Sequence, residues 1–175
     1  IQGAVTPGAP LVYLVTTVVG SVALVVHAQK PGFSEKPGFS PVSASVGLVW
    51  LDDLTEAHVR EAVLGPASDP ALGGYLGAYD GWRRKPRDET ARAAWHAALD
   101  ATTHWLWEKL MGAVVRELQD QGFEQAVLVP TGLLGLLPLH AAWTEDATRP
   151  VGLALIHIRS CRRANEGSSR GAPGT

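Results

Sequence analysis

The hydrophobic pattern at the start of the chain predicts a pair of β-strands. Residues 11–17 and 22–27 are rich in β-branched residues, which favour strands, and residues 18–21 form a short turn between them. We therefore expect a β-hairpin here. Because both segments are almost continuously apolar, the pattern also predicts that further layers cover both faces of the sheet. A third strand is predicted at residues 46–51.

Helix punctuation follows directly after the third predicted strand. Thr55 has the side chain of a good N-cap, and Leu54 and Val59 are spaced to pack against each other across it. Gly65, followed by proline, is expected to end this helix. Residues 66–87 contain closely spaced glycines, so we predict that they are irregular.

A long helical segment is predicted to begin after Asp88, a second good N-cap. Its apolar residues recur at i, i+3, i+4 and i+7, and Gly122 suits the helix end, so we expect either one bent helix or two. A short buried strand is predicted at residues 126–129. A helix followed by an apolar strand is typical of α/β proteins. We therefore predict an incomplete three-layer sandwich, with a mostly parallel sheet and an N-terminal β-hairpin.

Composition and charge narrow the possible partners. The 175 residues are 46% hydrophobic with a net charge of −2, which gives no reason to expect nucleic acid or membrane as a partner. The apolar run from Leu11 to Val26 is shorter than the roughly 20 residues of a spanning helix. The single cysteine, Cys161, cannot form an internal disulfide, and we expect a cytoplasmic protein. The first residue is Ile1, and we expect a piece of a longer protein.

The most distinctive segment of the chain spans residues 127–143 and has the sequence VLVPTGLLGLLPLHAAW. Pro130 suits a strand end because it donates no ladder hydrogen bond, and Gly132 permits a positive φ for a sharp reversal. Pro138 suits the first turn of a new helix. These residues serve packing and turn formation, and none of them activates a nucleophile.

This segment resembles the strand, Pro-Thr-Gly turn and Leu-Pro-Leu-His-Ala-Ala segment of CHAT domains, a family of caspase-like cysteine-peptidase domains often found behind tetratricopeptide repeats. The resemblance extends to the hairpin, to a strand ending in Trp50-Leu51-Asp52, and to a long helix containing Trp107 and Leu110. It covers roughly residues 8–150. It implies a caspase-like sandwich, a protein or peptide substrate for the parent protein and an upstream repeat domain as partner.

The resemblance also implies where catalytic residues would lie. CHAT domains resemble caspases in using a His/Cys dyad, in which the histidine assists formation of the thiolate. In the family, the histidine precedes a glycine at one strand end, and the cysteine follows a small pair at the next. Neither motif occurs in this sequence. We therefore interpret residues 1–153 as the N-terminal part of a CHAT-like domain that is inactive by itself.

Residues 154–175 differ abruptly from the rest of the chain. Arg, Ser and Gly dominate this tail, the apolar periodicity ends, and the string resembles translated sequencing-adapter DNA. We interpret the tail as irregular and non-native. His157 and Cys161 lie four residues apart within it and could share one helix face, but the family places its dyad on two strand ends.

Other candidate residues predict no site, so we expect no catalytic residue, no cofactor and no metal. His140 has no following glycine, and a structural role near a helix end is expected for it. His96 and His104 have no carboxylate cluster at ligand spacing, so a metal site is not expected. The sequence contains no phosphate loop, no dinucleotide fingerprint and no hydrolase elbow.

Two alternatives to a peptidase fragment remain open at this point. The first is a non-catalytic caspase-like scaffold or signalling interaction module that keeps the fold without the dyad. The second is an unrelated α/β nucleotide-binding domain. Nucleotides would raise the melting temperature of the second and leave that of a caspase-like domain unchanged.

Overall fold

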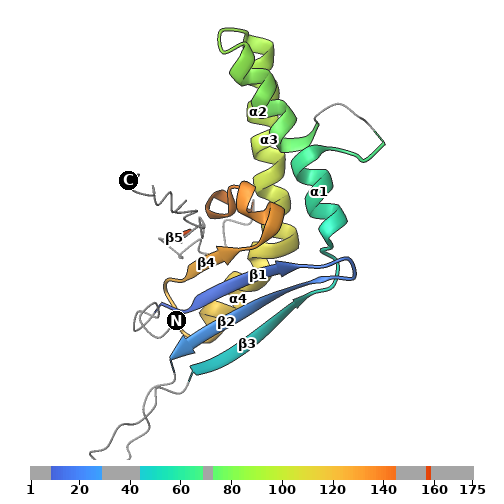
Figure 1. The fold of residues 1–175 in the computed structure, drawn as a ribbon. Helices are drawn as coiled ribbons and strands as arrows, with labels where there is room; N and C mark the ends of the chain where they lie inside the picture. The colour runs from blue at the N-terminus through green and yellow to red at the C-terminus, as the bar shows by residue number, and fades with distance from the viewer. Residues whose placement is uncertain (1–8, 29–43, 69–72, 145–156, 159–175) are drawn as a thin grey trace, which may run out of the picture.

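The computed structural model of this chain describes residues 9–28, 44–68, 73–144 and 157–158. These residues form a sheet with the strand order β3-β2-β1-β4-β5, packed against helices (Figure 1). The α/β class predicted from the sequence is confirmed. The strands are β1 (Leu11–Thr16), β2 (Ser21–Ala28), β3 (Ala44–Leu51), β4 (Val127–Pro130) and β5 (His157–Ile158).

The sheet is mixed, so the prediction of a mostly parallel sheet is wrong. β2 pairs antiparallel with both β1 and β3, whereas β4 pairs in parallel with both β1 and β5. The predicted hairpin of β1 and β2 is confirmed, and the Thr17 N–H closes its turn by donating to the Gly20 carbonyl at 2.9 Å. A turn this short forces an antiparallel pair, whereas β4 returns beside β1 after the intervening helices and can run parallel.

Among the residues that the structure describes, five helical segments lie between β3 and β4, and two short 3₁₀ turns follow β4. They are α1 (Glu56–Leu64), α2 (Gly74–Arg84), α3 (Glu89–Leu106), the π-helical turn η1 (Trp107–Met111), α4 (Gly112–Asp120), and the 3₁₀ turns η2 (Gly132–Leu136) and η3 (Leu139–Ala141). Among the described residues, no helix has the length and apolar character needed to cross a bilayer.

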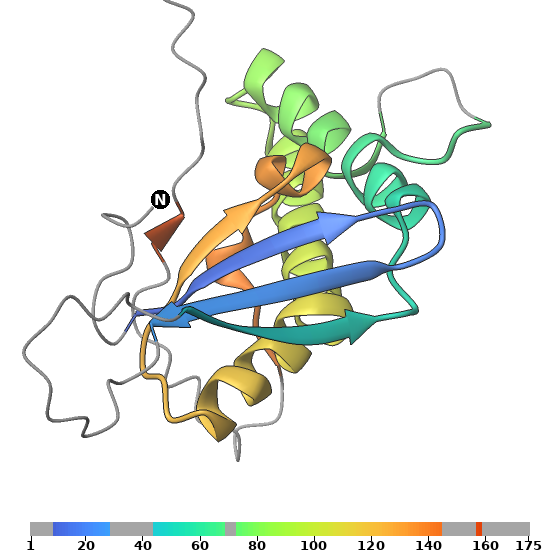
Figure 2. The same cartoon turned by 60° about the horizontal axis from the view of Figure 1, so that its bottom comes forward.

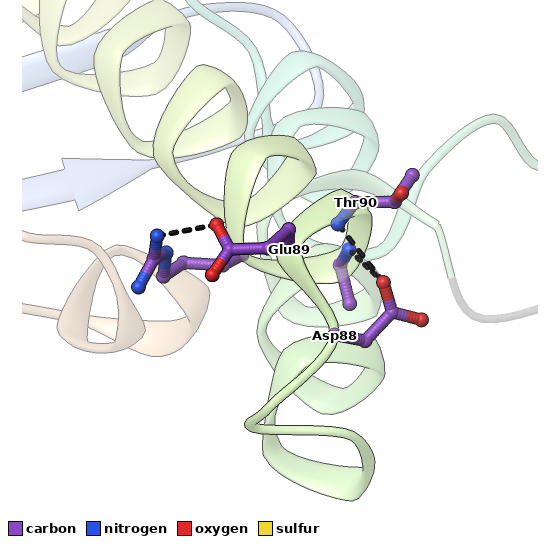
Figure 3. Close-up of polar contacts among 5 residues, drawn as sticks. Asp88, Glu89 and Thr90 are labelled. Atoms are coloured by element: carbon purple, nitrogen blue, oxygen red, sulfur yellow. Dashed lines mark hydrogen bonds and ion pairs between the residues drawn. The ribbon is translucent and has the colours of Figure 1, made fainter.

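The long helical segment is continuous. α3 passes into α4 through η1, and the residues at both junctions, Trp107 and Gly112, have right-handed helical dihedral angles. A π-turn inserts an extra residue without ending a helix. Asp88 caps the first turn as predicted, because one carboxylate oxygen accepts from the N–H groups of Thr90 and Ala91 (Figure 3). Gly122, with a φ of 75°, follows the helix end as predicted.

α2 lies where an irregular segment was predicted, so that prediction is wrong. Tyr75, Tyr79 and Trp82 recur along this helix at i, i+4 and i+7, and all three rings lie against Trp95 of α3. The Trp82 and Trp95 rings are stacked, with centroids 6.3 Å apart and planes 13° from parallel. Aromatic packing in the tertiary structure thus offsets the low helix propensity of the glycines.

The core lies on one face of the sheet. Val12 and Leu14 of β1 and Ala23 and Val25 of β2 are fully buried there, in one cluster with the apolar residues of η1 and α4. The helix that runs from α3 to α4 passes behind these strands in Figure 2. The other face differs at β3, where Val46, Leu48 and Trp50 are 52–67% exposed. The prediction that both faces are covered, which was made from the segments of β1 and β2, is therefore not met at β3, whereas Leu24 on the same face of β2 is half-buried.

Candidate functional site

The carboxyl ends of β1 and β4 lie at the end of the sheet where α/β proteins most often bind their ligands. Thr131 follows β4, and its N–H and its hydroxyl both donate to the Leu14 carbonyl of β1, at 3.0 and 2.8 Å. Gly132 then takes a φ of 55°, as the turn was predicted to require. The Pro-Thr-Gly turn is thus attached directly to the central strand.

The start of α1 lies at the same end of the sheet. The Glu56 N–H donates to the Thr17 carbonyl at 2.8 Å, and the Ser21 hydroxyl donates to the Leu54 carbonyl. Thr55 caps α1 as predicted, and the buried side chains of Leu54 and Val59 belong to the core. These bonds hold the helix start against the β1–β2 hairpin.

His58 completes a reciprocal cap that the sequence reasoning missed. Its N–H donates to Oγ1 of Thr55 at 3.4 Å, and its Nδ1 accepts from the Thr55 N–H at 3.3 Å. The third position after an N-cap usually holds Glu or Gln in this motif. A histidine is harder to recognise there, although its spacing from Thr55 was available in the sequence. Since Nδ1 is engaged as an acceptor, Nε2 is the ring nitrogen left for other contacts.

A shallow cleft of about 290 Å³ lies between α1 and α3. Its lining is mostly apolar, and two titratable side chains, His58 and Glu61, come from α1. The lining residues are His58, Glu61, Ala62, Ala101, Thr102 and Trp105. Its volume is at the lower limit for small-molecule pockets. His58 is the natural base here, but the hydroxyl that it contacts, Oγ1 of Thr55, already serves the cap. The described residues therefore form no nucleophile–base pair in this cleft.

The end of the distinctive segment is attached to α3 by hydrogen bonds. Nε1 of Trp143 donates to Oγ1 of Thr103 at 3.1 Å, and the Thr103 hydroxyl donates back to the Leu99 carbonyl at 2.9 Å. The rings of Trp143 and His104 lie 5.2 Å apart. Nε2 of His104 lies 3.5 Å from the Glu108 carboxylate, whereas its buried Nδ1 has no hydrogen-bond partner among the described residues. His104 thus belongs to the packing around η1.

The other predicted positions do not converge on one site. His140 is exposed on η3. His157 begins β5, opposite Val127, whereas Cys161 lies outside the described residues. His96 is exposed on α3, and the parts of the chain that the structure describes contain no group of three potential metal ligands.

Comparison of the chain with protein-family models, with curated proteins and with solved structures gives no match. The family assignment therefore depends on residues 127–143 and on the geometry around them, and we argue it as a proposal.

Proposed function

We propose that this chain is the N-terminal part of a caspase-like cysteine-peptidase domain of the CHAT type, and that it supplies scaffold without the catalytic dyad. One observation carries this proposal: the Pro-Thr-Gly turn follows a strand that runs parallel to the central strand β1. A strand that leads directly into a Pro-Thr-Gly turn is what the likeness of residues 127–143 to CHAT domains implies.

The packing of the same segment supports the proposal. Leu134, Leu137 and Leu139 follow the turn and are at most 4% exposed, and all three belong to the main core. Because these side chains pack inward, the Leu-Pro-Leu-His-Ala-Ala segment contributes to the scaffold.

The chemistry assigned to the parent protein is peptide-bond cleavage by a thiolate. A histidine at one strand end would accept the cysteine proton, the thiolate would attack the peptide carbonyl, and backbone N–H groups would stabilise the oxyanion. The sheet described here would position the strand ends that carry those groups. This chain would bring no activity of its own, because neither dyad motif occurs in its sequence.

A peptide probe with a thiol-reactive warhead tests the inactivity of this chain. We expect the probe to label Cys161 no faster than an ordinary thiol reacts, as judged by the rate at which iodoacetamide alkylates Cys161. The labelling rate should be the same in a His157→Ala variant. A Cys161→Ser variant provides the background. Rapid labelling of Cys161 that is lost in the His157→Ala variant would overturn the proposal.

The sequence of the source gene beyond residue 153 tests the proposal that the parent protein is a CHAT-type peptidase. We expect the native reading frame beyond residue 153 to encode a His-Gly strand end, followed by a strand end with a small pair before cysteine. If the downstream sequence continues the caspase-like fold but lacks both the histidine and the cysteine, the parent protein would be a non-catalytic scaffold and not a peptidase. A native frame that continues through Cys161 would contradict our interpretation of the tail.

A further inference from the structure

The cleft between α1 and α3 has a charged side and an aromatic side. His58, Glu61 and Ala62 are spaced at i, i+3 and i+4 on α1, so their side chains share one face of that helix. Trp105, which is half-buried, lines the cleft from α3. Ala62 and Ala101 have short side chains, and they leave room for the volume of about 290 Å³. The cleft thus combines a carboxylate with an apolar surface.

The side of the cleft that α1 provides is held in place by the start of α2. The Gly65 N–H donates to the Glu61 carbonyl at 2.8 Å, which closes the last turn of α1. At Gly74, whose φ is 57°, an added Cβ would lie 2.7 Å from the Ala62 carbonyl oxygen, so the two backbones pack directly. This side of the cleft is therefore preformed, and a ligand spends little binding free energy on ordering it.

The electrostatics of α1 favour a cation in this cleft. Glu61 lies in the last turn of α1, which ends at Leu64. The carbonyl groups at the end of a helix carry partial negative charge, so they stabilise cations and disfavour a carboxylate. This turn, which the structure describes in full, contains no basic residue. The Glu61 carboxylate and the helix dipole therefore both attract a positive charge from outside the turn.

The other groups of the lining accept a cation that carries an apolar group. The face of a tryptophan ring attracts cations, and the ring also offers a large apolar surface. Nδ1 of His58 accepts from the Thr55 N–H at 3.3 Å. A ring nitrogen that accepts a hydrogen bond carries no proton, so His58 is neutral in this geometry and does not repel a cation.

We propose that this cleft binds a small organic cation, namely a protonated amine attached to a short apolar or aromatic group. The ammonium group lies against the Glu61 carboxylate, and the apolar group packs on Trp105 and the two alanines. The exposed carboxylate contributes only modestly to binding, and the cleft is small, so we expect a Kd of about 1 mM. This inference is independent of the family proposed above.

Nuclear magnetic resonance titration of the full chain tests the class of ligand. The probe is 2-phenylethylammonium, and its matched controls are 2-phenylethanol, which is neutral, and 3-phenylpropionate, which is an anion. We expect the probe to shift the indole N–H signal of Trp105 saturably, with a Kd about 5-fold lower than that of the alcohol, whereas the anion gives no saturable shift. The signal is assigned by its loss in Trp105→Phe. Equal binding of the amine and the alcohol, or no shift of the Trp105 signal, would overturn the proposal.

Two pairs of variants at exposed positions test the placement of the ligand. Glu61→Gln should raise the Kd of the amine about 5-fold and leave that of the alcohol unchanged, whereas Glu56→Gln, in the first turn of the same helix, should alter neither. Ala101→Leu should fill the cleft and remove the saturable shift, and Ala94→Leu, also exposed on α3, is its control. Circular dichroism confirms that each variant is folded. Unchanged amine binding in Glu61→Gln or in Ala101→Leu would contradict binding in this cleft.

Discussion

The sheet body and the helical hairpin of this molecule are stabilised in different ways. The sheet body consists of β1–β4, η1 and α4, and its central side chains, such as Leu14 and Val25, are completely buried. The helical hairpin consists of α2 and the part of α3 before Thr102, and projects away from the sheet (Figure 1). No residue of α2 is buried, and the buried residues of α3 lie in its last turns.

This difference in burial shows that different interactions stabilise the two regions of one chain. Hydrophobic burial stabilises the sheet body, because each fully buried leucine or valine removes apolar surface from water. Half-buried rings, a helix cap and local ion pairs stabilise the helical hairpin, and surface pairs such as Arg84–Asp80 contribute little. We therefore expect the hairpin to open at a lower free energy than the body.

The largest expected effect is a cavity in the sheet body. Leu14→Ala removes a fully buried side chain, and should lower the free energy of unfolding by about 3 kcal/mol. Leu136→Ala, at a side chain that is 50% exposed on η2, is the matched control and should cost less than about 1 kcal/mol. Urea denaturation followed by circular dichroism measures both. Similar losses of unfolding free energy for Leu14→Ala and Leu136→Ala would show that burial does not determine the stability of the sheet body.

A truncation in the helical hairpin comes next. Trp95 contacts all three aromatic rings of α2, so Trp95→Ala should cost about 2 kcal/mol, less than a fully buried tryptophan would. Hydrogen exchange should rise across residues 74–84 while β1 stays protected. Trp95→Phe retains part of the packing, so its free energy of unfolding should lie between those of the unmodified chain and of Trp95→Ala. Loss of protection in β1 to the same extent would mean that the two regions unfold as one.

The cap of α3 provides a smaller and more local test. Asp88→Ala leaves the Thr90 and Ala91 N–H groups without their acceptor, and should cost about 1 kcal/mol (Figure 3). Asp88→Asn is the matched control, since asparagine caps equally well. Thermal unfolding measures the difference. Equal melting temperatures for Asp88→Ala and the unmodified chain would show that the cap does not limit the stability of the hairpin.

The smallest effect concerns pH. Burial, followed by the charge of Tyr79, raises the pKa of Tyr75 above its usual value of 10.0. Above that pH the unfolded chain loses the Tyr75 proton while the folded chain retains it, so stability falls as pH rises. Tyr75→Phe should make this alkaline fall shallower, as measured by denaturation between about pH 9 and 11. An unchanged slope would show that Tyr75 is as solvated in the folded hairpin as in the unfolded chain.

Local signals in the sequence account for the elements that were predicted correctly. The caps at Thr55 and Asp88, the β1–β2 hairpin and the turn after β4 each depend on residues close together in the chain. α2 was missed because its helical stripe of aromatic residues needs Trp95 for packing, and Trp95 lies beyond the hairpin bend. The candidate site was predicted only as a turn, since the bond from Thr131 to Leu14 joins distant segments.

The sequence by itself determined most of the strands and helices and where they begin and end, with α2 and the short strand β5 as the exceptions. These properties follow from side-chain shape, capping and periodicity over a few residues. Only the tertiary structure decided the parallel pairing of β4 with β1, the π-turn between α3 and α4, and the exposure of β3. Each of these depends on contacts between segments far apart in the chain, and the energy of such contacts has no local signature.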